Sequence, residues 1–451
     1  MSIVTRPTQQ TRSKDVIGQL LWPSDEALSE GFFFANFALI EGQPQSAEFW
    51  KSSIPHPALS STLKAVGLAG LARHEHSPSL MTRAQKQYLN AVTQTNAALS
   101  LPETAKEDNT LVTTMLLGQF EVIAGNDEAS MTAWKNHIQG SAALLKLRGI
   151  EQIQSPWKAR LFTQVVSSLN TACLRYGLPM PEEVTVLRRQ MSQYVGHRSG
   201  FLTHWNCSLD YVDFNVRIRQ GLMENPAEIL MKAREIEDRY IAFESTLSDE
   251  KRYQTFESRM SHPLIFSDTY HMYPDFFVAQ MWNSIRSTRT MLAWTIYDAL
   301  QELETGELSI GQKASIEEAK TQAAETAKTM LLGILASVPQ HIGCNSDGPS
   351  IQKHQESGKP GYNFLWSNFK QSIWRFEPTP NASVDVGPQP LLRIFGGYLL
   401  PWVVYLVGKS DFSTPEMRAY VLKVLQHLGS DFGIGQAYAL MEDVKTGRFS
   451  Y

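Results

Sequence analysis

The sequence holds one short stretch in which residues able to contact a small molecule follow one another closely. His271 and Tyr273 lie two positions apart, and Trp282 follows nine positions later. Histidine and tyrosine side chains donate and accept hydrogen bonds, and aromatic rings can enclose an apolar molecule. One interpretation is a pocket where His271, Tyr273 and Asp275 converge on a small hydrophobic effector. The other, commoner for such clusters, is a helix start packed by aromatics, with Asp275 in the first turn where the helix dipole favours an acid.

A second pair of candidates lies in the first half of the chain. Trp134, Ile138, Ser141 and Leu145 recur at spacings of four, three and four, which predicts one buried stripe on a helix. His137 lies beside this stripe, and we expect a packed, hydrogen-bonded histidine there rather than a catalytic base. The alternative is again contact with an effector. The full set of candidate ligand-binding residues is Trp134, His137, His271, Tyr273 and Trp282.

The motifs of common enzyme classes are missing. The segment 433–438 (GIGQAY) begins like a dinucleotide-binding loop, but Tyr438 stands where the third glycine belongs and no strand precedes it. A helix start is the better interpretation. Ser346 lacks the first glycine of a nucleophile elbow, and there is no phosphate-binding loop of the Walker type. We therefore assign no catalytic residue.

Metal-binding patterns are missing as well. His74 and His76 are two positions apart, so on a helix they point to different faces, and no third ligand lies near them in the sequence. Cys173, Cys207 and Cys344 are far apart and form no CxxC pair, which removes the usual basis of a structural zinc site. We expect no metal and no cofactor.

Charge and hydropathy bear on whether the chain binds DNA, is secreted or enters a membrane. The 451 residues contain 41 basic and 45 acidic side chains, and Arg188-Arg189 is the most notable basic pair, so direct DNA contact by this chain is not indicated. The N-terminal residues lack the apolar run of a secretory signal. The most apolar stretch, 394–407, is shorter than the roughly 20 residues of a membrane span, and we predict buried core there. We expect an intracellular protein that is neither secreted nor membrane-bound.

Helical periodicity dominates the sequence, and convincing strand patterns are few, so we predict an all-α fold. The helix that runs to Arg148 should be capped by Ser130 or Thr132 and stop at Gly149. The predicted helices span 57–76, 80–100, 106–124, 130–148, 157–176, 181–195, 226–245, 275–304, 313–337, 414–429 and 431–446.

The domain organisation should be simple. We predict a mobile tail over 1–20 and one large multi-helix body over 21–451. Glycine and proline gather in 343–363 and 377–390, which predicts two long surface loops within that body.

Several strings, in order along the chain, resemble the regulatory domain of fungal binuclear zinc-cluster transcription factors. Together they extend over roughly residues 57–446. The strings are Ala65-Val66-Gly67-Leu68-Ala69, Tyr88-Leu89-x-Ala91, Trp134-x-x-His137-x-x-Gly140 with Leu144 and Arg148-Gly149, Tyr273-Pro274-Asp275 with Val278-Ala279, Trp282-Asn283 and Arg286, Ser337-Val338-Pro339 with Gly343, and Pro401-Trp402 with Arg418, Leu425 and Gly433-Ile434-x-x-Ala437.

The resemblance implies a nuclear regulator of transcription, possible also in the cytoplasm, built on one helical shell. Members normally open with six cysteines that hold two zinc ions and place a helix in the major groove. Here the first cysteine is Cys173. We therefore expect a regulator that lacks its own zinc cluster and acts through a DNA-bound protein partner. In this it resembles regulators of secondary-metabolite (mycotoxin) gene clusters in filamentous fungi, such as the trichothecene pathway regulator.

One alternative of another class stays open. The same helical shell could serve as an enzyme or ligand-binding protein of such a pathway, for example a cyclase or isomerase acting on a hydrophobic intermediate. Catalysis of that kind can rely on shape and hydrogen bonding without a signature motif. The sequence also leaves open a homodimer formed through an apolar helix face.

Overall fold

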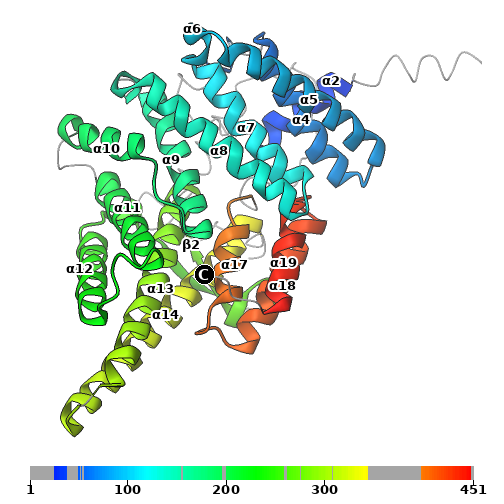
Figure 1. The fold of residues 1–451 in the computed structure, drawn as a ribbon. Helices are drawn as coiled ribbons and strands as arrows, with labels where there is room; N and C mark the ends of the chain where they lie inside the picture. Colours follow the sequence, from blue (N-terminus) through cyan, green and yellow to red (C-terminus); the bar gives the residue numbers. More distant parts are fainter. Residues whose placement is uncertain are drawn as a thin grey trace, which may run out of the picture.

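The computed structural model describes most of the chain, and in this part almost every element is a helix (Figure 1). The all-α prediction is therefore confirmed. The predicted tail and, apart from Gly343, the two predicted loops lie outside the described residues. The described residues are 25–37, 49–50, 52, 55–153, 156–195, 200–258, 262–274, 276–306, 308–343 and 398–447.

The first half of the chain forms the blue to green helices of Figure 1. Its long helices α4, α5, α7 and α8 lie against one another in sequence order. The elements are α2 (Asp25–Asn36), α4 (Pro57–His74), α5 (Pro78–Leu99), α6 (Pro102–Ala105), α7 (Asp108–Ala124), α8 (Glu128–Arg148), the short η1 (Ile150–Ile153), α9 (Pro156–Tyr176) and α10 (Glu182–Val195).

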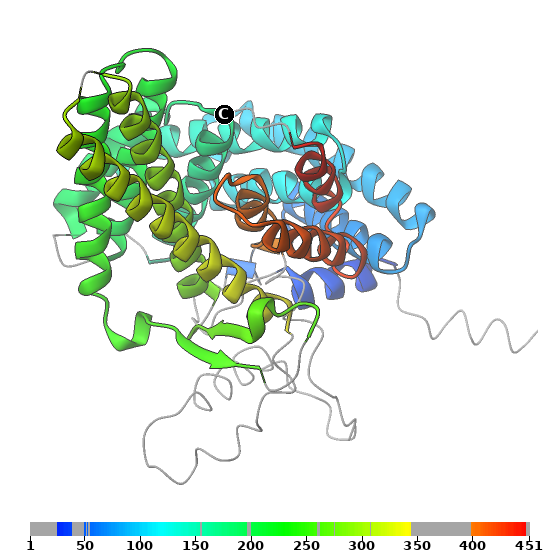
Figure 2. The same cartoon turned by 90° about the horizontal axis from the view of Figure 1, so that it is seen from below.

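The second half adds a long pair of helices, α13 and α14, which lie side by side; α13 also packs on α12, and one end of the pair protrudes beyond the other elements (Figure 1). Figure 2 shows a two-stranded antiparallel ribbon beside the C-terminal end of α14. The elements are α11 (Gly200–Arg219), α12 (Pro226–Ser245), η2 (Asp249–Lys251), β1 (Gln254–Glu257), η3 (Phe266–Asp268), β2 (Thr269–Met272), α13 (Phe276–Glu304), α14 (Ile310–Ile342), α17 (Pro401–Lys409), α18 (Pro415–Ser430) and α19 (Gln436–Thr446).

Helix α8 shows how sequence sets its ends. The predicted caps Ser130 and Thr132 are wrong, because Asp127 begins the helix one turn earlier and accepts a hydrogen bond from the Ser130 backbone N–H (2.9 Å). Aspartate is among the strongest N-cap residues. The predicted stop is confirmed, since Gly149 takes φ 64°, which a glycine adopts without strain. The stripe that begins at Trp134 is buried as predicted.

Three segments differ from the predictions. Residues 269–272 form strand β2, which was not predicted and in which His271 pairs with Thr255 of β1, whereas the helix predicted from 275 does follow as α13 from Phe276. Helix α14 does not end at 337, as predicted, but continues through Pro339 to Ile342. Burial of Val338, Pro339, His341 and Ile342 in this last turn compensates for the hydrogen bond that proline cannot make. Helix α19 begins at Gln436 rather than at 431, since Gly433 has φ 68° and cannot continue a helix. Helices α2, α11 and α17 were not predicted.

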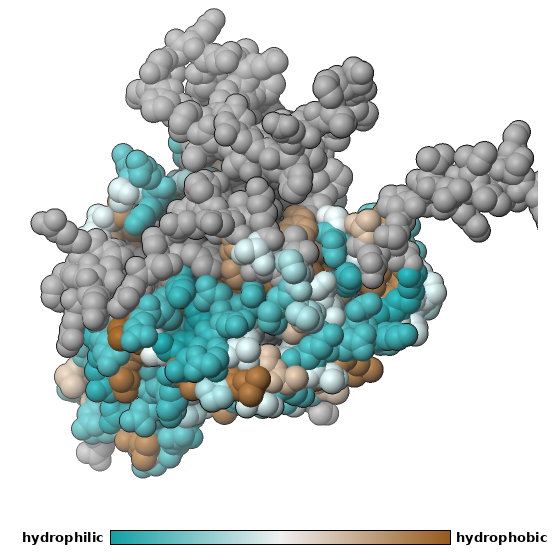
Figure 3. Space-filling model, turned by 90° about the horizontal axis from the view of Figure 1, so that it is seen from above, coloured by the Kyte–Doolittle hydropathy of each residue, from teal (hydrophilic) through white to brown (hydrophobic). Residues whose placement is uncertain are grey.

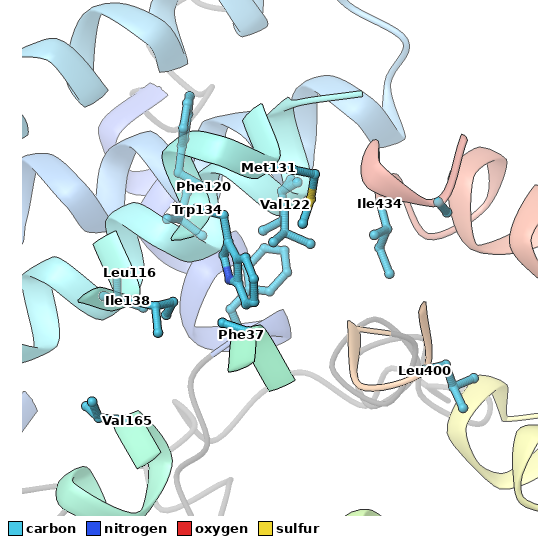
Figure 4. Packing of buried hydrophobic residues seen from close by; sticks show 14 of the residues in the cluster. Phe37, Leu116, Phe120, Val122, Met131, Trp134, Ile138, Val165, Leu400 and Ile434 are labelled. Atoms are coloured by element: carbon cyan, nitrogen blue, oxygen red, sulfur yellow. The ribbon is translucent and has the colours of Figure 1, made fainter. Parts of the chain in front are cut away.

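The apolar core has two parts. The larger cluster surrounds Trp134 and combines α4, α7, α8 and α9 with the C-terminal helices, and Figure 4 shows Phe120, Leu116 and Ile138 near the Trp134 indole. The smaller cluster lies among α11, α12 and α13. The stretch 394–407, which was predicted to be buried core, contributes the fully buried Leu400, Val404 and Val407 to the larger cluster.

The C-terminal segment closes against the end of α7. The Gly435 backbone N–H donates to the Ile123 carbonyl (3.2 Å), and the Gln436 amide donates to the Asp127 carbonyl (3.3 Å). A Cβ at Gly435 would lie 2.1 Å from the Gly125 carbonyl oxygen, so only glycine permits this approach. Figure 1 shows α19 beside α7 and α8 accordingly.

The surface visible from above is mostly hydrophilic, with isolated hydrophobic side chains among the described residues (Figure 3). Among the described helices, none is both long and apolar enough to cross a membrane.

Candidate functional site

The structure divides the five predicted site residues into two groups. His271, Tyr273 and Trp282 come together around two residues that the prediction left out of the site, Tyr253 and Arg286. Trp134 and His137 lie elsewhere, on α8, and they face different neighbours. The five residues therefore do not form one site.

The first group is built on the Tyr253 ring. Its centroid lies 4.1 Å from that of His271 and 4.9 Å from that of Trp282, whose ring is nearly perpendicular. The Arg286 guanidinium lies 4.8 Å from the Tyr253 centroid and 5.4 Å from the Trp282 centroid, within the range of cation–π attraction. Aromatic faces therefore surround this cation on more than one side.

Hydrogen bonds complete the group. Arg286 donates to the Tyr273 hydroxyl oxygen, and its second nitrogen lies 3.3 Å from His271 Nδ1. Because a guanidinium can only donate, Nδ1 must be the acceptor of that bond. Tyr273 Oη lies 3.2 Å from the same Nδ1. Histidine, tyrosine and arginine thus form one closed polar triangle.

Helix α14 holds this triangle in place. The Gln340 side chain accepts from the Tyr273 backbone N–H (2.7 Å) and donates to the Tyr273 carbonyl (3.0 Å), which fixes the chain just after β2. Asn283 donates to the Ser337 hydroxyl (2.9 Å), which ties α13 to α14. A Cβ at Gly333 would lie 2.5 Å from Arg286 Nε, so the glycine makes room for the arginine.

The triangle is sealed from solvent. Tyr273 is 1% exposed, Arg286 3% and His271 9%, which leaves almost no side-chain surface for an effector. Burial, with the nearby Arg286 charge, lowers the pKa of His271 to about 3, so the imidazole is neutral at pH 7. Among the described residues, no carboxylate pairs with Arg286. Asp275, named with this group in the sequence, lies outside the described residues.

The second group forms where α5, α7 and α8 meet. The Tyr88 hydroxyl donates to Glu121 and lies 2.9 Å from His137 Nε2, while that nitrogen is 3.9 Å from Glu121 Oε1. Phe120 stacks on the Tyr88 ring with centroids 4.4 Å apart. Burial lowers the pKa of His137 to about 4 and raises that of Glu121. His137 is hydrogen-bonded, as predicted.

A pocket of about 130 Å³ opens beside His137. This is smaller than the roughly 300–1,000 Å³ of drug-sized sites, so a large hydrophobic metabolite would not fit. His137 is the one predicted site residue that lines it. The lining residues are Val92, Thr95, Asn96, Leu99, Thr114, Leu117, Asn136, His137 and Gly140.

Trp134 faces the C-terminal helices instead. Its ring stacks on Trp402 of α17, with centroids 5.8 Å apart and planes inclined by 26°. The Arg175 guanidinium lies 4.1 Å from the Trp402 centroid. Trp134 is 5% exposed, so its role in the structure is to pack α8 against α17.

Sequence reasoning missed most partners in both groups. Tyr88, Glu121 and His137 come from three helices, and no local spacing could link them. Tyr253 lies beyond a loop from His271, and only strand pairing brings the two close. Arg286 was noted on the helix that follows the aromatic cluster, but its burial was not foreseen.

The described residues hold no group of three or more histidine, cysteine or acidic side chains placed to bind a metal ion. Cys173 and Cys207 are both buried, and burial raises the pKa of both thiols, that of Cys173 to about 12. Thiols of this kind are poor nucleophiles at neutral pH. The two cysteines therefore act as core residues.

Comparison with known proteins gives one positive result. No curated protein and no solved structure matches the chain. A family model described as fungal specific transcription factor domain matches residues 19–272, which is more than half of the chain and extends through β2. Both the His137 group and the strand that carries His271 fall inside this match. The chain belongs to the fungal-specific transcription factor domain family.

Proposed function

We propose that this protein regulates the transcription of a fungal secondary-metabolite gene cluster from the nucleus, and that it reaches DNA through a DNA-bound protein partner. The observation that carries the regulatory role is the family match over residues 19–272. The pathway class rests on the resemblance described above to regulators of such clusters. The partner rests on two features of the chain itself.

The first feature is the cysteine content. The 451 residues contain three cysteines, whereas the zinc cluster of such factors uses six. Cys173 and Cys207 are buried in the helical body, so they are not available to a metal cluster on the surface. These residues supply no zinc-dependent reading helix.

The second feature is how arginine charge is used. Arg148 pairs with Asp108, and Arg188 and Arg239 both pair with Asp210. Arg289 pairs with Glu237 and Glu244 (2.8 Å to the latter). Arginine charges that are already paired with carboxylates of the same chain release few counterions from DNA, so they add little to phosphate binding.

Chromatin immunoprecipitation of the tagged protein, together with transcript profiling of a deletion strain, tests the regulatory role. We expect enrichment at a set of promoters and a coordinated change in the transcripts of one gene cluster. Fluorescence of the tagged protein should lie in the nucleus. Unchanged transcripts with accumulation of one pathway intermediate would refute the proposal and favour the enzyme alternative.

A second experiment tests the partner. The purified chain is mixed with an enriched promoter fragment in a mobility-shift assay, with and without nuclear extract from the deletion strain. We expect a shift containing the tagged chain only when the extract is present. A specific shift by the purified chain alone would show direct DNA contact and would overturn the partner mechanism, while leaving regulation intact.

A further inference from the structure

The groove beside His137 is lined by both apolar and polar side chains. Val92, Leu99 and Leu117 supply the apolar part, and Asn96 and Asn136 carry amides at the rim. Asn136 and Gly140 are exposed, so the groove is open to solvent at the α8 side. Apolar side chains together with a few polar groups are the usual make-up of a small-molecule site.

The size of the groove limits the ligand. An apolar cavity of about 150 Å³ accommodates benzene. At about 130 Å³ the groove takes a body of similar size, and its open side lets one end of the ligand reach solvent. Larger metabolites would fit only in part.

The positions of the protons on Tyr88 and His137 determine which imidazole nitrogen can accept a hydrogen bond from a ligand. With Glu121 ionised, the single Tyr88 proton is donated to the carboxylate. The Tyr88 oxygen is then free to accept, so His137 Nε2, at 2.9 Å, must carry the proton of that bond. Neutral imidazole carries one proton, which leaves Nδ1 as a bare acceptor.

Nδ1 is also accessible. No described residue hydrogen-bonds to it, and it is not one of the buried unpaired atoms. Because His137 lines the groove, an unpaired acceptor on its ring is one that a ligand in the groove can use. Asn96 and Asn136 could then bond a second polar end of the ligand at the rim.

We propose that this groove binds a small uncharged molecule, with an apolar body of about benzene size and a hydroxyl or N–H that donates a hydrogen bond to His137 Nδ1. As an effector site the groove rests on the proposed regulatory function, whereas binding itself is tested on the purified chain. Failure of binding with normal promoter occupancy would sink only this inference. Failure of promoter occupancy with normal binding would sink only regulation.

Phenol and toluene are matched probes, because they share the ring and differ in the hydroxyl group. Saturation-transfer difference NMR on the full-length purified protein gives a Kd for each probe. We expect phenol to bind about fivefold more tightly than toluene, since one hydrogen bond is worth roughly 1 kcal/mol. Nitrogen NMR of histidine-labelled protein should show His137 with its proton on Nε2.

Two variants separate the parts of the inference. Gly140→Leu should fill the groove and weaken both probes at least about tenfold, as expected for a blocked apolar site. A Cβ at Gly140 meets only Thr114 Cγ2 at 3.7 Å, an ordinary contact, so the fold should persist. His137→Phe should remove the preference for phenol. Gly311→Leu, at an exposed glycine with open space on α14, is the matched control.

The opposing results are equally definite. Unchanged binding of both probes by Gly140→Leu would place the site elsewhere. A phenol preference that survives in His137→Phe, or a proton found on His137 Nδ1, would overturn the assigned acceptor. Absence of phenol binding by the wild-type chain would overturn the inference as a whole.

Discussion

Two groups of the same residue types, one histidine and one tyrosine each, have opposite settings in this molecule. His137 and Tyr88 share a partly buried carboxylate, Glu121, and His137 borders an open groove. His271 and Tyr273 share a buried guanidinium, Arg286, and are sealed by α14. Both imidazoles have a lowered pKa, because burial acts on both. The two groups therefore differ in their access to solvent, and not in residue type or in the direction of the pKa shift.

The charge at the centre of each group also differs. A carboxylate only accepts hydrogen bonds, so a hydroxyl that donates to it can still accept a hydrogen bond from another residue. A guanidinium only donates, so each polar atom that bonds to it must be an acceptor. Among the described residues, aromatic faces and the Tyr273 hydroxyl, rather than a carboxylate, surround the Arg286 guanidinium. Such an arrangement stabilises only while every member is present.

Removing the central cation should give the largest effect. We expect Arg286→Ala to lower the free energy of unfolding by about 2–4 kcal/mol, because it opens a cavity and leaves buried acceptors unpaired. Urea unfolding followed by circular dichroism measures this. Arg234→Ala, on the exposed face of α12, should stay within about 0.5 kcal/mol. Equal losses in the two variants would mean that the triangle is not a structural joint.

Acid should destabilise both groups. The pKa of His137 falls to about 4 and that of His271 to about 3 on folding, so the unfolded chain binds more protons below its own pKa of about 6.5. Stability is thus full above about 6.5 and is lost as the pH falls towards 4, by up to about 3 kcal/mol for each imidazole. The buried His204 and His341, with pKa values of about 4, add to this slope.

Urea midpoints between pH 7.5 and 4.5 test this loss, and His204→Phe, beside Phe243 and Tyr240, should flatten the curve. His76→Asn, at an exposed turn, is the matched control. Imidazole NMR sharpens the comparison further. If His137 titrates with a normal pKa while His271 does not, the two groups differ in burial more than their geometry indicates.

A single methyl group should destabilise the sealed region. Gly333→Ala places a Cβ against the pinned Arg286 side chain, and we expect a loss of about 1–3 kcal/mol from overpacking. In an Arg286→Ala background the loss should shrink, because the colliding atoms are gone. A double-mutant cycle of urea midpoints measures the coupling. Additive losses would show that Gly333 and Arg286 do not compete for the same space.

Adding the same methyl group at the groove should raise the stability of the fold rather than lower it. Gly140→Ala adds a Cβ at an exposed helical position in ordinary contact with Thr114, and alanine favours helix by about 1 kcal/mol over glycine. We expect the melting temperature to rise slightly. A fall comparable to that of Gly333→Ala would mean that the groove is as tightly closed as the Arg286 triangle.

Helices whose apolar periodicity and end residues lie within their own segment could be predicted from the sequence. Helix α8 was predicted from its apolar stripe and from Gly149, and α12 from the same periodicity after Pro226. Strand β2 was not predicted, since its pairing with β1 depends on residues across a loop. Helix α14 passes Pro339 because tertiary burial outweighs the local helix-breaking preference.

The candidate sites were likewise predictable where their residues are close in the sequence, and not where they depend on distant helices. The sequence showed that His271, Tyr273 and Trp282 are near neighbours, and the structure does bring them together. It could not show their burial, which Gln340 and Gly333 of a distant helix impose. Nor could it show that Tyr88 reaches His137, because that contact depends on the packing angle of two helices.

The contact between Gly435 and Ile123 also constrains how the chain folds during synthesis. Helix α7 leaves the ribosome long before its closing segment, since Gln436 and Asp127 are 309 positions apart. Until Gly435 arrives, the Ile123 carbonyl lacks that donor, and the larger core lacks Ile434. Contacts of such long sequence separation form slowly. The N-terminal half of this protein therefore reaches its full stability only when nearly the whole chain has been made, and nascent chains that stop before residue 434 should be substrates for chaperones.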